Sequence, residues 1–215
     1  MVRIKPDNTV SQNTIGNNGS FLADDLLTRY NRLKALVIER RESFSNLMAF
    51  IEEKTSYLTA PASIKYHLSK ESGLLEHSIN AAETMLKIKQ TLAPEISDES
   101  CVIVALLHDL GKAGMPGNPQ YLENEPSVKQ QQYGYKANTP YRFNRDLTYL
   151  SVPIRSIYLA LPYISLTEEE VQAIVYHDGQ YVDDNRSVAA KEAKLTLLLQ
   201  YADNWSGFII EKEGQ

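Results

Sequence analysis

Apolar residues recur at intervals of three and four along most of this 215-residue chain. Leu26, Tyr30, Leu33 and Val37 show the spacing, which places their side chains on one face of a helix. Alternation with a period of two, which marks a half-buried strand, is scarce. We therefore predict an all-α fold, with helices near residues 21–38, 44–53, 74–90, 98–110, 152–161, 168–177 and 189–205.

Capping residues support several of these helix ends. Ser97 is a good N-cap, and Asp98 adds negative charge to the first turn that follows it. Thr167 and Glu170 have the spacing of a capping box, and Gly179 follows the end of the same predicted helix. These ends indicate separate helices joined by turns. The sequence shows no internal repeat.

The chain divides into three parts by composition. Residues 1–20 are rich in Asn, Ser, Gly and Gln and predict a flexible tail. Residues 21–58 predict N-terminal helices that pack on the core domain at 59–208. Within that domain, residues 113–150 hold three Gly, four Pro and five Tyr and predict an irregular insertion. A connection of this length is either a plain surface insertion or a lid over a substrate.

Composition limits the chemistry. The single Cys101 excludes an internal disulfide framework and a Cys-rich zinc site, so a metal site must use His and carboxylates. The net charge of −5 argues against a surface that traps duplex nucleic acid. The longest apolar run, Cys101–Leu107, is too short for a membrane span, and the N-terminus has no apolar signal region. We therefore expect a cytoplasmic protein with no membrane partner.

The strongest local signal is an apolar helix that ends in His108-Asp109. Adjacent helix residues point about 100° apart, so the two side chains share one ion only where the helix ends and the chain opens. His77 lies on an earlier predicted helix, and Asp203 lies near an apolar face of the last one. Burying a carboxylate is costly unless it is paired or binds a cation. Two imidazoles and two carboxylates from three helices suit a divalent transition metal with open water positions.

In this order, His77, His108-Asp109 and Asp203 resemble the H…HD…D signature of the HD-domain metal-dependent phosphohydrolases. The surrounding sequence strengthens the resemblance, with GLLEHS at 73–78, LHDLGK at 107–112 and further similar blocks at 173–177 and 200–203. The nearest subgroup includes small bacterial and phage hydrolases and the HD part of a 3′–5′ exoribonuclease. The resemblance implies a single HD-domain helical bundle that hydrolyses phosphate esters.

The resemblance also implies roles for individual residues. The metal ligands are then His77, His108, Asp109 and Asp203. Lys112 and His177 are the candidate catalytic residues, and His67 is a candidate substrate contact. Apart from the resemblance, Arg142, Arg145 and Arg155 are candidate substrate contacts, because guanidinium groups suit a phosphate and could replace the charge of a second ion. Each of these six has a plain alternative, as a helix-capping or core His, a solvated Lys or an exposed Arg.

One departure from the family pattern bears on the number of metal ions that we expect. Members with two ions tend to carry a Gly-His-Gly-like segment before the helix that precedes the His177 block. The corresponding residues 149–156 contain no His. We therefore expect one divalent ion (Mn, Fe, Co, Ni or Zn, with Mg as an alternative) rather than two.

The function that these observations favour is hydrolysis of a phosphate ester of a nucleotide or similar small molecule through a metal-activated water. One alternative is a phosphodiesterase or exonuclease on single-stranded nucleic acid, which we do not favour because no separate oligonucleotide-binding domain is present. Another is a non-catalytic nucleotide-binding HD module, which the missing His would explain. The N-terminal helices could also pair two subunits into a homodimer.

Overall fold

The computed structural model describes residues 18–212. Its longer helices are α1 (Asn18–Lys34), α2 (Arg41–Lys54), α3 (Gly73–Leu92), α4 (Asp98–Leu107), α6 (Val152–Ala160), α7 (Glu168–Val175) and α8 (Lys194–Phe208). The shorter elements are α5 (Val128–Gln132), the strands β1 (Tyr121–Glu123) and β2 (Tyr141–Phe143), and 3-10 turns at Leu110–Ala113, Gly179–Tyr181, Asp183–Val188 and Ile210–Lys212. The all-α prediction is confirmed, since the described residues hold only this one two-stranded sheet.

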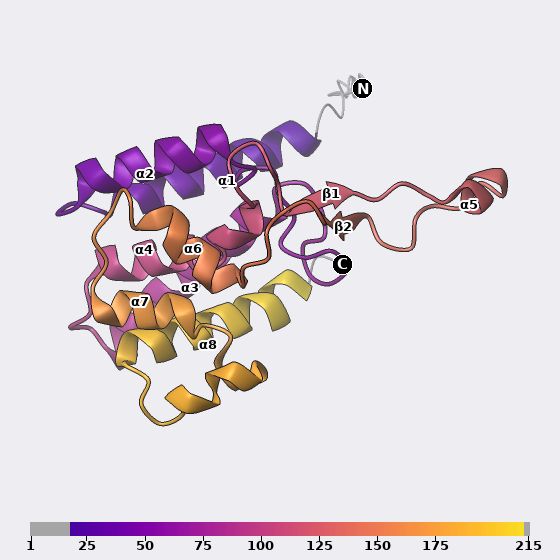
Figure 1. Ribbon diagram of the computed structural model, residues 1–215. Coiled ribbons are helices and arrows are strands. Elements are labelled where there is room, and N and C mark those ends of the chain that lie inside the picture. The colour runs from indigo at the N-terminus through magenta and orange to yellow at the C-terminus, as the bar shows by residue number, and fades with distance from the viewer. Residues whose placement is uncertain (1–17, 213–215) are drawn as a thin grey trace, which may run out of the picture.

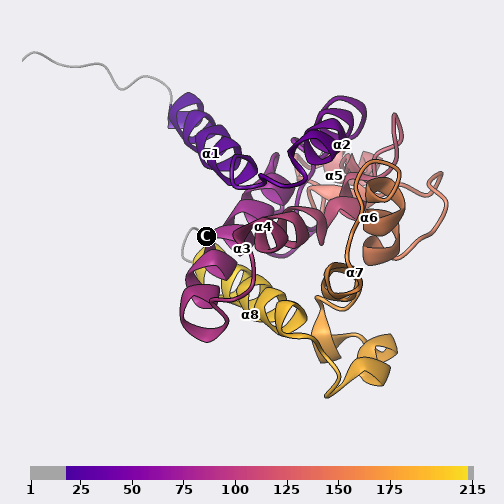
Figure 2. The same cartoon turned by 90° about the vertical axis from the view of Figure 1, so that its left-hand side faces the viewer.

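The helices α3 and α4 form the centre of the fold. Helix α3 packs against both α8 and α4, and α4 also contacts α6, α7 and α8. Viewed end-on, α1 and α2 cover one side of this pair while α7 and α8 cover the other (Figure 2). Every residue from Cys101 to Leu107 is fully buried, which explains why α4 is apolar all round rather than amphipathic.

The ends of α4 are fixed by the residues that the sequence indicates. Ser97 accepts a hydrogen bond from the Ser100 amide at the start of the helix. At the other end α4 stops at Leu107, three residues before the predicted boundary, and a 3-10 turn follows at Leu110–Ala113. The chain thus leaves the helix directly at His108-Asp109.

Helix α6 packs very closely on this turn. A side chain at Gly111 would place its Cβ 2.2 Å from the Val152 carbonyl oxygen, so only glycine fits there. The Ser156 hydroxyl accepts a hydrogen bond from the Gly111 amide at 2.8 Å and lies 3.0 Å from the His108 carbonyl oxygen. The start of α6 therefore locks the turn that carries His108 and Asp109.

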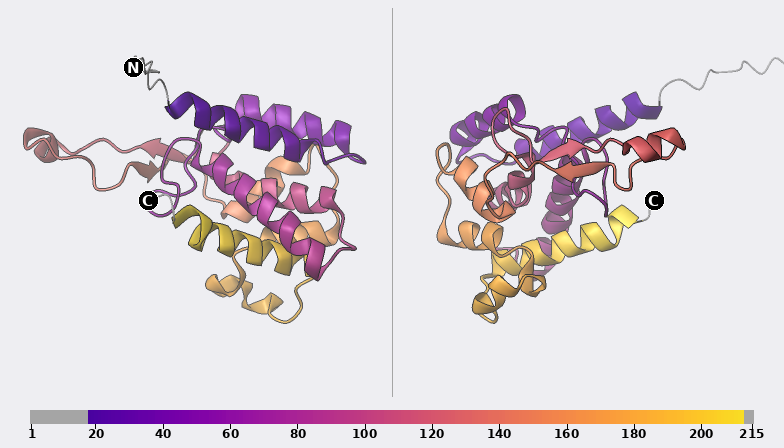
Figure 3. Two further views of the ribbon diagram at one scale, coloured as in Figure 1. Left: turned by 180° about the vertical axis from the view of Figure 1, so that it is seen from behind. Right: turned by 45° about the vertical axis from the view of Figure 1, so that its right-hand side comes forward.

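Residues 113–150, predicted to be irregular, contain regular elements. β1 pairs with β2 in antiparallel register, with Leu122 opposite Arg142, and α5 lies between the strands in the chain. We call residues 121–145 the arm, because it projects away from the helical body with α5 at its far end (Figures 1 and 3). Strands of three residues are too short to show alternation in the sequence, which is why this hairpin was not predicted.

Two further boundaries differ from the prediction. Residues 18–20 belong to α1 rather than to the predicted tail, whose other residues lie outside the described part of the chain. The last helix starts at Lys194 instead of 189, because the backbone of Ala190 is left-handed with φ 61° and interrupts a helical path. Across residues 18–212, no helix has the length and apolar character needed to cross a membrane.

Candidate metal centre

Three helices bring the four predicted metal ligands together. His77 comes from α3, His108 and Asp109 from the end of α4, and Asp203 from α8. We call these four residues the metal-site cluster. The His77 Nε2 atom lies 3.3 Å from His108 Nε2, 3.0 Å from an Asp203 oxygen and 3.6 Å from an Asp109 oxygen. His108 Nε2 lies 3.5 Å from the same Asp109 oxygen and 3.9 Å from the same Asp203 oxygen.

These separations suit ligands of a single ion. Nitrogen and oxygen ligands about 2.1 Å from a metal lie about 3.0 Å apart in octahedral geometry and about 3.4 Å apart in tetrahedral geometry. The two imidazoles lie 3.3 Å apart, and their Nε2 atoms lie 3.0–3.9 Å from the two carboxylates, close to both values. The residues present therefore fit a divalent metal ion, with imidazole nitrogens and carboxylate oxygens as a typical transition-metal donor set.

Hydrogen bonds orient both imidazoles of the cluster. His108 Nδ1 donates to the Ala105 carbonyl oxygen at 2.8 Å, one turn back along α4. His77 Nδ1 donates to Glu211 at 2.9 Å. With Nδ1 occupied in this way, each ring directs its Nε2 atom toward the centre, which is the orientation that a metal ligand requires.

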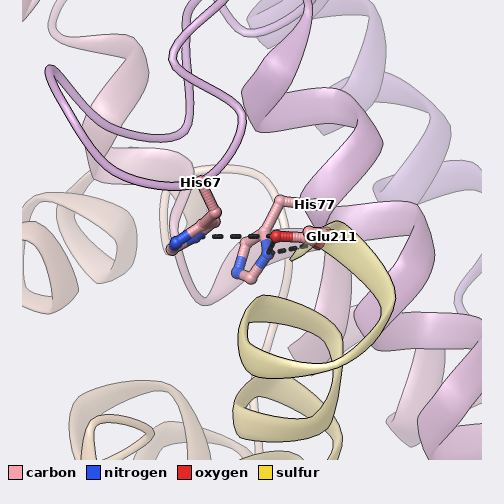
Figure 4. Close-up of side chains that lie close together, drawn as sticks. All are labelled: His67, His77 and Glu211. Carbon is pink, nitrogen blue, oxygen red and sulfur yellow. Dashed lines mark hydrogen bonds and ion pairs between the residues drawn. The ribbon is translucent and has the colours of Figure 1, made fainter. Parts of the chain in front are cut away.

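Sequence reasoning missed Glu211, which belongs to the 3-10 turn after α8 (Figure 4). It is only 5% exposed and also accepts a hydrogen bond from the Asn80 side chain. The sequence carried no usable signal, because α8 ends at Phe208 and Glu211 belongs to a separate 3-10 turn, so helical spacing from Asp203 does not place it. Its role is to hold the His77 ring from behind.

His67, predicted to contact substrate, lies beside this outer layer. Its ring centre is 5.1 Å from that of His77, and its Nε2 atom is 3.7 Å from a Glu211 oxygen (Figure 4). That Nε2 atom is buried without a hydrogen-bond partner among the described residues. Burial lowers the pKa of His67, which favours a neutral ring. His67 is thus next to the site, beside Glu211 and the ring of the ligand His77.

The two candidate catalytic residues both face Asp109. The Lys112 ammonium pairs with an Asp109 oxygen at 2.5 Å, and the His177 Nε2 atom lies 3.6 Å from the other oxygen. His177 Nδ1 donates to the Ile174 carbonyl oxygen at 2.8 Å, so this ring is oriented like that of His108. His108, Asp109 and His177 form a second group able to share an ion.

Burial and charge set the protonation of the cluster. Burial lowers the pKa of His108 to about 4, which leaves its Nε2 lone pair free. Burial opposes a charge on His77, but Asp203 and Glu211 outweigh it and raise its pKa to about 10. Likewise, burial resists ionisation of Asp203, yet the hydrogen bond from His77 lowers its pKa below the usual range. The carboxylates are therefore ionised and call for nearby positive charge.

No hydrogen bond or ion pair joins any of the three candidate arginines to the metal-site cluster among residues 18–212, although Arg155 reaches the nearby Gly111 carbonyl oxygen at 3.4 Å. Arg155 is 2% exposed, and its guanidinium donates to the Gln120 side chain and to the Thr148 carbonyl oxygen at 2.8 Å. It therefore ties both ends of the arm segment to α6. Arg142 and Arg145 are exposed on and after β2, where they line a hollow at the base of the arm.

Comparison with known protein families agrees with this geometry. The family model described as HD domain matches residues 74–205, which span all four members of the metal-site cluster. No curated protein and no solved structure matches the chain. Because the match covers more than half of the chain, the protein belongs to the HD-domain family, whose members are typically metal-dependent hydrolases.

Proposed function

We propose that this HD-domain protein hydrolyses a phosphate ester of a nucleotide or a similar phosphorylated molecule with one bound divalent ion. The observation that carries the proposal is that two imidazoles 3.3 Å apart, from two helices, each lie 3.0–3.9 Å from two carboxylates. The ion would be held by His77, His108, Asp109 and Asp203. A divalent ion in such a site polarises a phosphoryl oxygen and lowers the pKa of a water molecule.

Lys112 supplies positive charge for the substrate. Its ammonium lies within hydrogen-bond distance of Asp109, and its side chain is 19% exposed, so Lys112 is partly open to solvent beside the metal-site cluster. As a compact charge with three donors, it can hold a non-bridging phosphate oxygen. A Lys112→Met variant should keep its metal and lose turnover, which separates substrate binding from metal binding.

His177 has two roles open to it in the same mechanism. Its Nε2 atom, directed at Asp109, can complete the ligand set or give a proton to the leaving oxygen. A His177→Ala variant distinguishes these roles. Loss of metal indicates that His177 is a ligand. A proton donor is indicated if the metal is retained, hydrolysis of esters with a poor leaving group slows, and hydrolysis of esters with a good leaving group such as p-nitrophenolate does not.

Support for a single ion comes from the surroundings of the cluster. Residues 149–156 contain no His, and Glu211 is engaged with His77 and Asn80. We assign Glu211 and His67 to the support of the first ion rather than to a second one.

The test begins with metal analysis of the purified protein, followed by a hydrolysis screen over nucleoside monophosphates, nucleoside triphosphates and bis-p-nitrophenyl phosphate. The expected result is about one divalent ion per chain and turnover that chelator removes. Thermal stabilisation by nucleotides without turnover of any ester would instead identify a non-catalytic module. Failure to bind any divalent ion would overturn the proposal.

A further inference from the structure

The arm has a charge opposite to that of the rest of the molecule. Residues 126–145 contain four Lys or Arg and no Asp or Glu, whereas the whole chain has a net charge of −5. The whole arm, residues 121–145, also includes two acids and carries +2, so the rest of the chain carries −7. The two acids of the arm, Glu123 and Glu125, lie on and just after β1. All four cations are exposed, namely Lys129, Lys136, Arg142 and Arg145.

These cations are not used to stabilise the fold. Other exposed cations, such as Lys194 and Arg186, form ion pairs with nearby carboxylates. None of the four arm cations forms an ion pair with a residue between 18 and 212. Positive groups kept unpaired and exposed on a projecting segment are available to a polyanion.

Exposed aromatic rings accompany the cations. Tyr133 and Tyr135, which follow α5 at the far end of the arm, are 67% and 66% exposed, with ring centres 6.3 Å apart. Phe143 on β2 is 56% exposed. Aromatic rings interleaved with basic groups are what single-stranded nucleic acid needs, because rings stack on bases while cations meet phosphates.

The aromatic surface continues along the hairpin to the base of the arm. Phe143 lies opposite Tyr121, with ring centres 5.5 Å apart. The residue before Tyr121 is Gln120, and its amide nitrogen lies so close to Gly114 that a Cβ at Gly114 would be 2.4 Å from it. Gly114 directly follows the turn Leu110–Ala113, whose Lys112 pairs with Asp109. The base of the arm thus lies against the turn that follows the metal-site cluster.

A hollow of about 650 Å³ provides a second connection. Thr139 and Pro140 of the arm line it, and so does Glu211, which holds His77. Its wall adds Lys65, which forms no ion pair among the described residues, and Tyr66, which is 73% exposed. The wall also includes Ser69, whose buried hydroxyl oxygen has no partner among those residues.

From these observations we propose that the arm and the hollow at its base bind single-stranded nucleic acid and lead it to the metal-site cluster. This inference rests on the proposed function and narrows its substrate class to polynucleotide phosphodiesters. It reverses the expectation from the sequence, which did not favour nucleic acid, because the arm supplies the basic and aromatic groups that a separate binding domain would otherwise provide. Charge and aromatic content favour nucleic acid over a protein partner. Duplex is disfavoured because its stacked bases cannot reach the tyrosines.

The first test measures binding separately from chemistry. Fluorescence anisotropy with a labelled, phosphorothioate-linked oligothymidine of 12 nucleotides reports affinity for the full-length, metal-loaded protein. For a single strand, each cation that binds a phosphate adds about −0.7 to the slope of log affinity against log salt concentration. Four cations thus predict a slope of about −2.8 and about 50-fold weaker binding at 200 mM than at 50 mM salt.

Two sets of variants locate the binding surface. Replacing Lys129, Lys136, Arg142 and Arg145 by Gln should weaken binding at least about 10-fold and flatten the salt slope. A matched control replaces the exposed Lys54, Lys87, Arg186 and Lys191 by Gln, changes the net charge equally, and should alter affinity less than about twofold. Tyr133→Ala with Tyr135→Ala should cost at least about fivefold, which is the effect of one lost base stack.

Three outcomes overturn the inference: no binding of the oligonucleotide at 50 mM salt, equal losses in the arm and control variants, or a change of oligomeric state in the arm variants with unchanged affinity. The last would identify the arm as a protein contact. Hydrolysis of bis-p-nitrophenyl phosphate keeps this test distinct from that of the proposed function. If the small ester is cleaved but the oligonucleotide does not bind, only the role of the arm is wrong.

Discussion

His108 is fully buried, and hydrogen bonds from α4 and α6 surround it, whereas Tyr133 on the arm is 67% exposed. The same difference holds for the residues around them. The metal-site cluster draws its members from three helices far apart in the sequence. In residues 126–138, the hydrogen bonds that the structure shows join partners within that segment, such as Gln130 to Asn138. The chain thus separates a buried site held by long-range contacts from an exposed segment held by local ones.

The difference also appears in how charge is treated. In the metal-site cluster, both carboxylates form ion pairs, Asp203 with His77 and Asp109 with Lys112, because an unpaired buried charge is costly. The arm cations have no carboxylate partner within the described part of the chain, and an exposed charge without a partner costs little in water. A buried site must be complete to be stable, while an exposed surface can keep its charges for a ligand.

The largest expected effect comes from breaking the cluster itself. Asp109 belongs both to the metal-site cluster and to the group that it forms with His108 and His177. Asp109→Ala removes this shared donor, so metal content should fall from about one ion per chain to near zero, and turnover should disappear. Elemental analysis and ester hydrolysis measure both. Asp146→Ala, on the exposed surface, is the control and should retain both. A fully metallated, active Asp109→Ala protein would contradict the site.

The next effect concerns the scaffold behind the cluster. Arg40 pairs with Glu99 at 2.7 Å and with Glu170 at 2.6 Å, and so fastens the starts of α4 and α7, the helices that lead to His108 and His177. Arg40→Met leaves the fully buried Glu170 without its cation and should lower the free energy of unfolding by about 3 kcal/mol. Urea denaturation measures the change. Arg41→Met, next to it and exposed, should be neutral.

The same pair predicts a pH dependence. Burial opposes ionisation of Glu99 and Glu170, but Arg40 and backbone amides lower the pKa of each below the ordinary value of 4.5. Their contribution is therefore fully present above pH 4.5 and is lost as the pH falls through the lowered pKa values. In Arg40→Met this loss should begin at higher pH. Identical pH profiles for the two proteins would show that the pair does not couple to folding.

A smaller effect is expected from the support of His77. Glu211→Gln keeps the size of the side chain but weakens the hydrogen bond that orients the ring, so metal affinity should fall about 10- to 100-fold. Competition with a fluorescent chelator measures the affinity. Glu53→Gln, exposed on α2, is the control. Unchanged affinity in Glu211→Gln would remove Glu211 from the site.

The smallest effect should follow removal of the outer arm. Replacing residues 126–138 by Asn-Gly shortens the hairpin loop beyond the Asn124–Pro140 hydrogen bond, which lies at its base. Because this segment is exposed and bonds to itself, Tm should change by less than about 2 °C and metal content should stay the same. Calorimetry and elemental analysis check this. Loss of metal would show that the arm helps to build the cluster.

The sequence was sufficient for much of the fold. Helical spacing predicted all seven of the longer helices, and the capping box at Thr167 forms as its spacing indicates. These features are local, so neighbouring residues carry them. The predicted helix boundaries were wrong where distant contacts or a left-handed residue such as Ala190 decide where a helix starts or ends.

The candidate site divides in the same way. The order of His77, His108-Asp109 and Asp203 marks the ligands in the sequence, because each ligand sits at a fixed place on its own helix. Only the tertiary structure shows Glu211 behind His77, Arg155 tied to the ends of the arm segment, and the arm standing away from the body. The physical reason is that periodicity and caps are set within a few residues, whereas these contacts depend on which distant segments packing brings together.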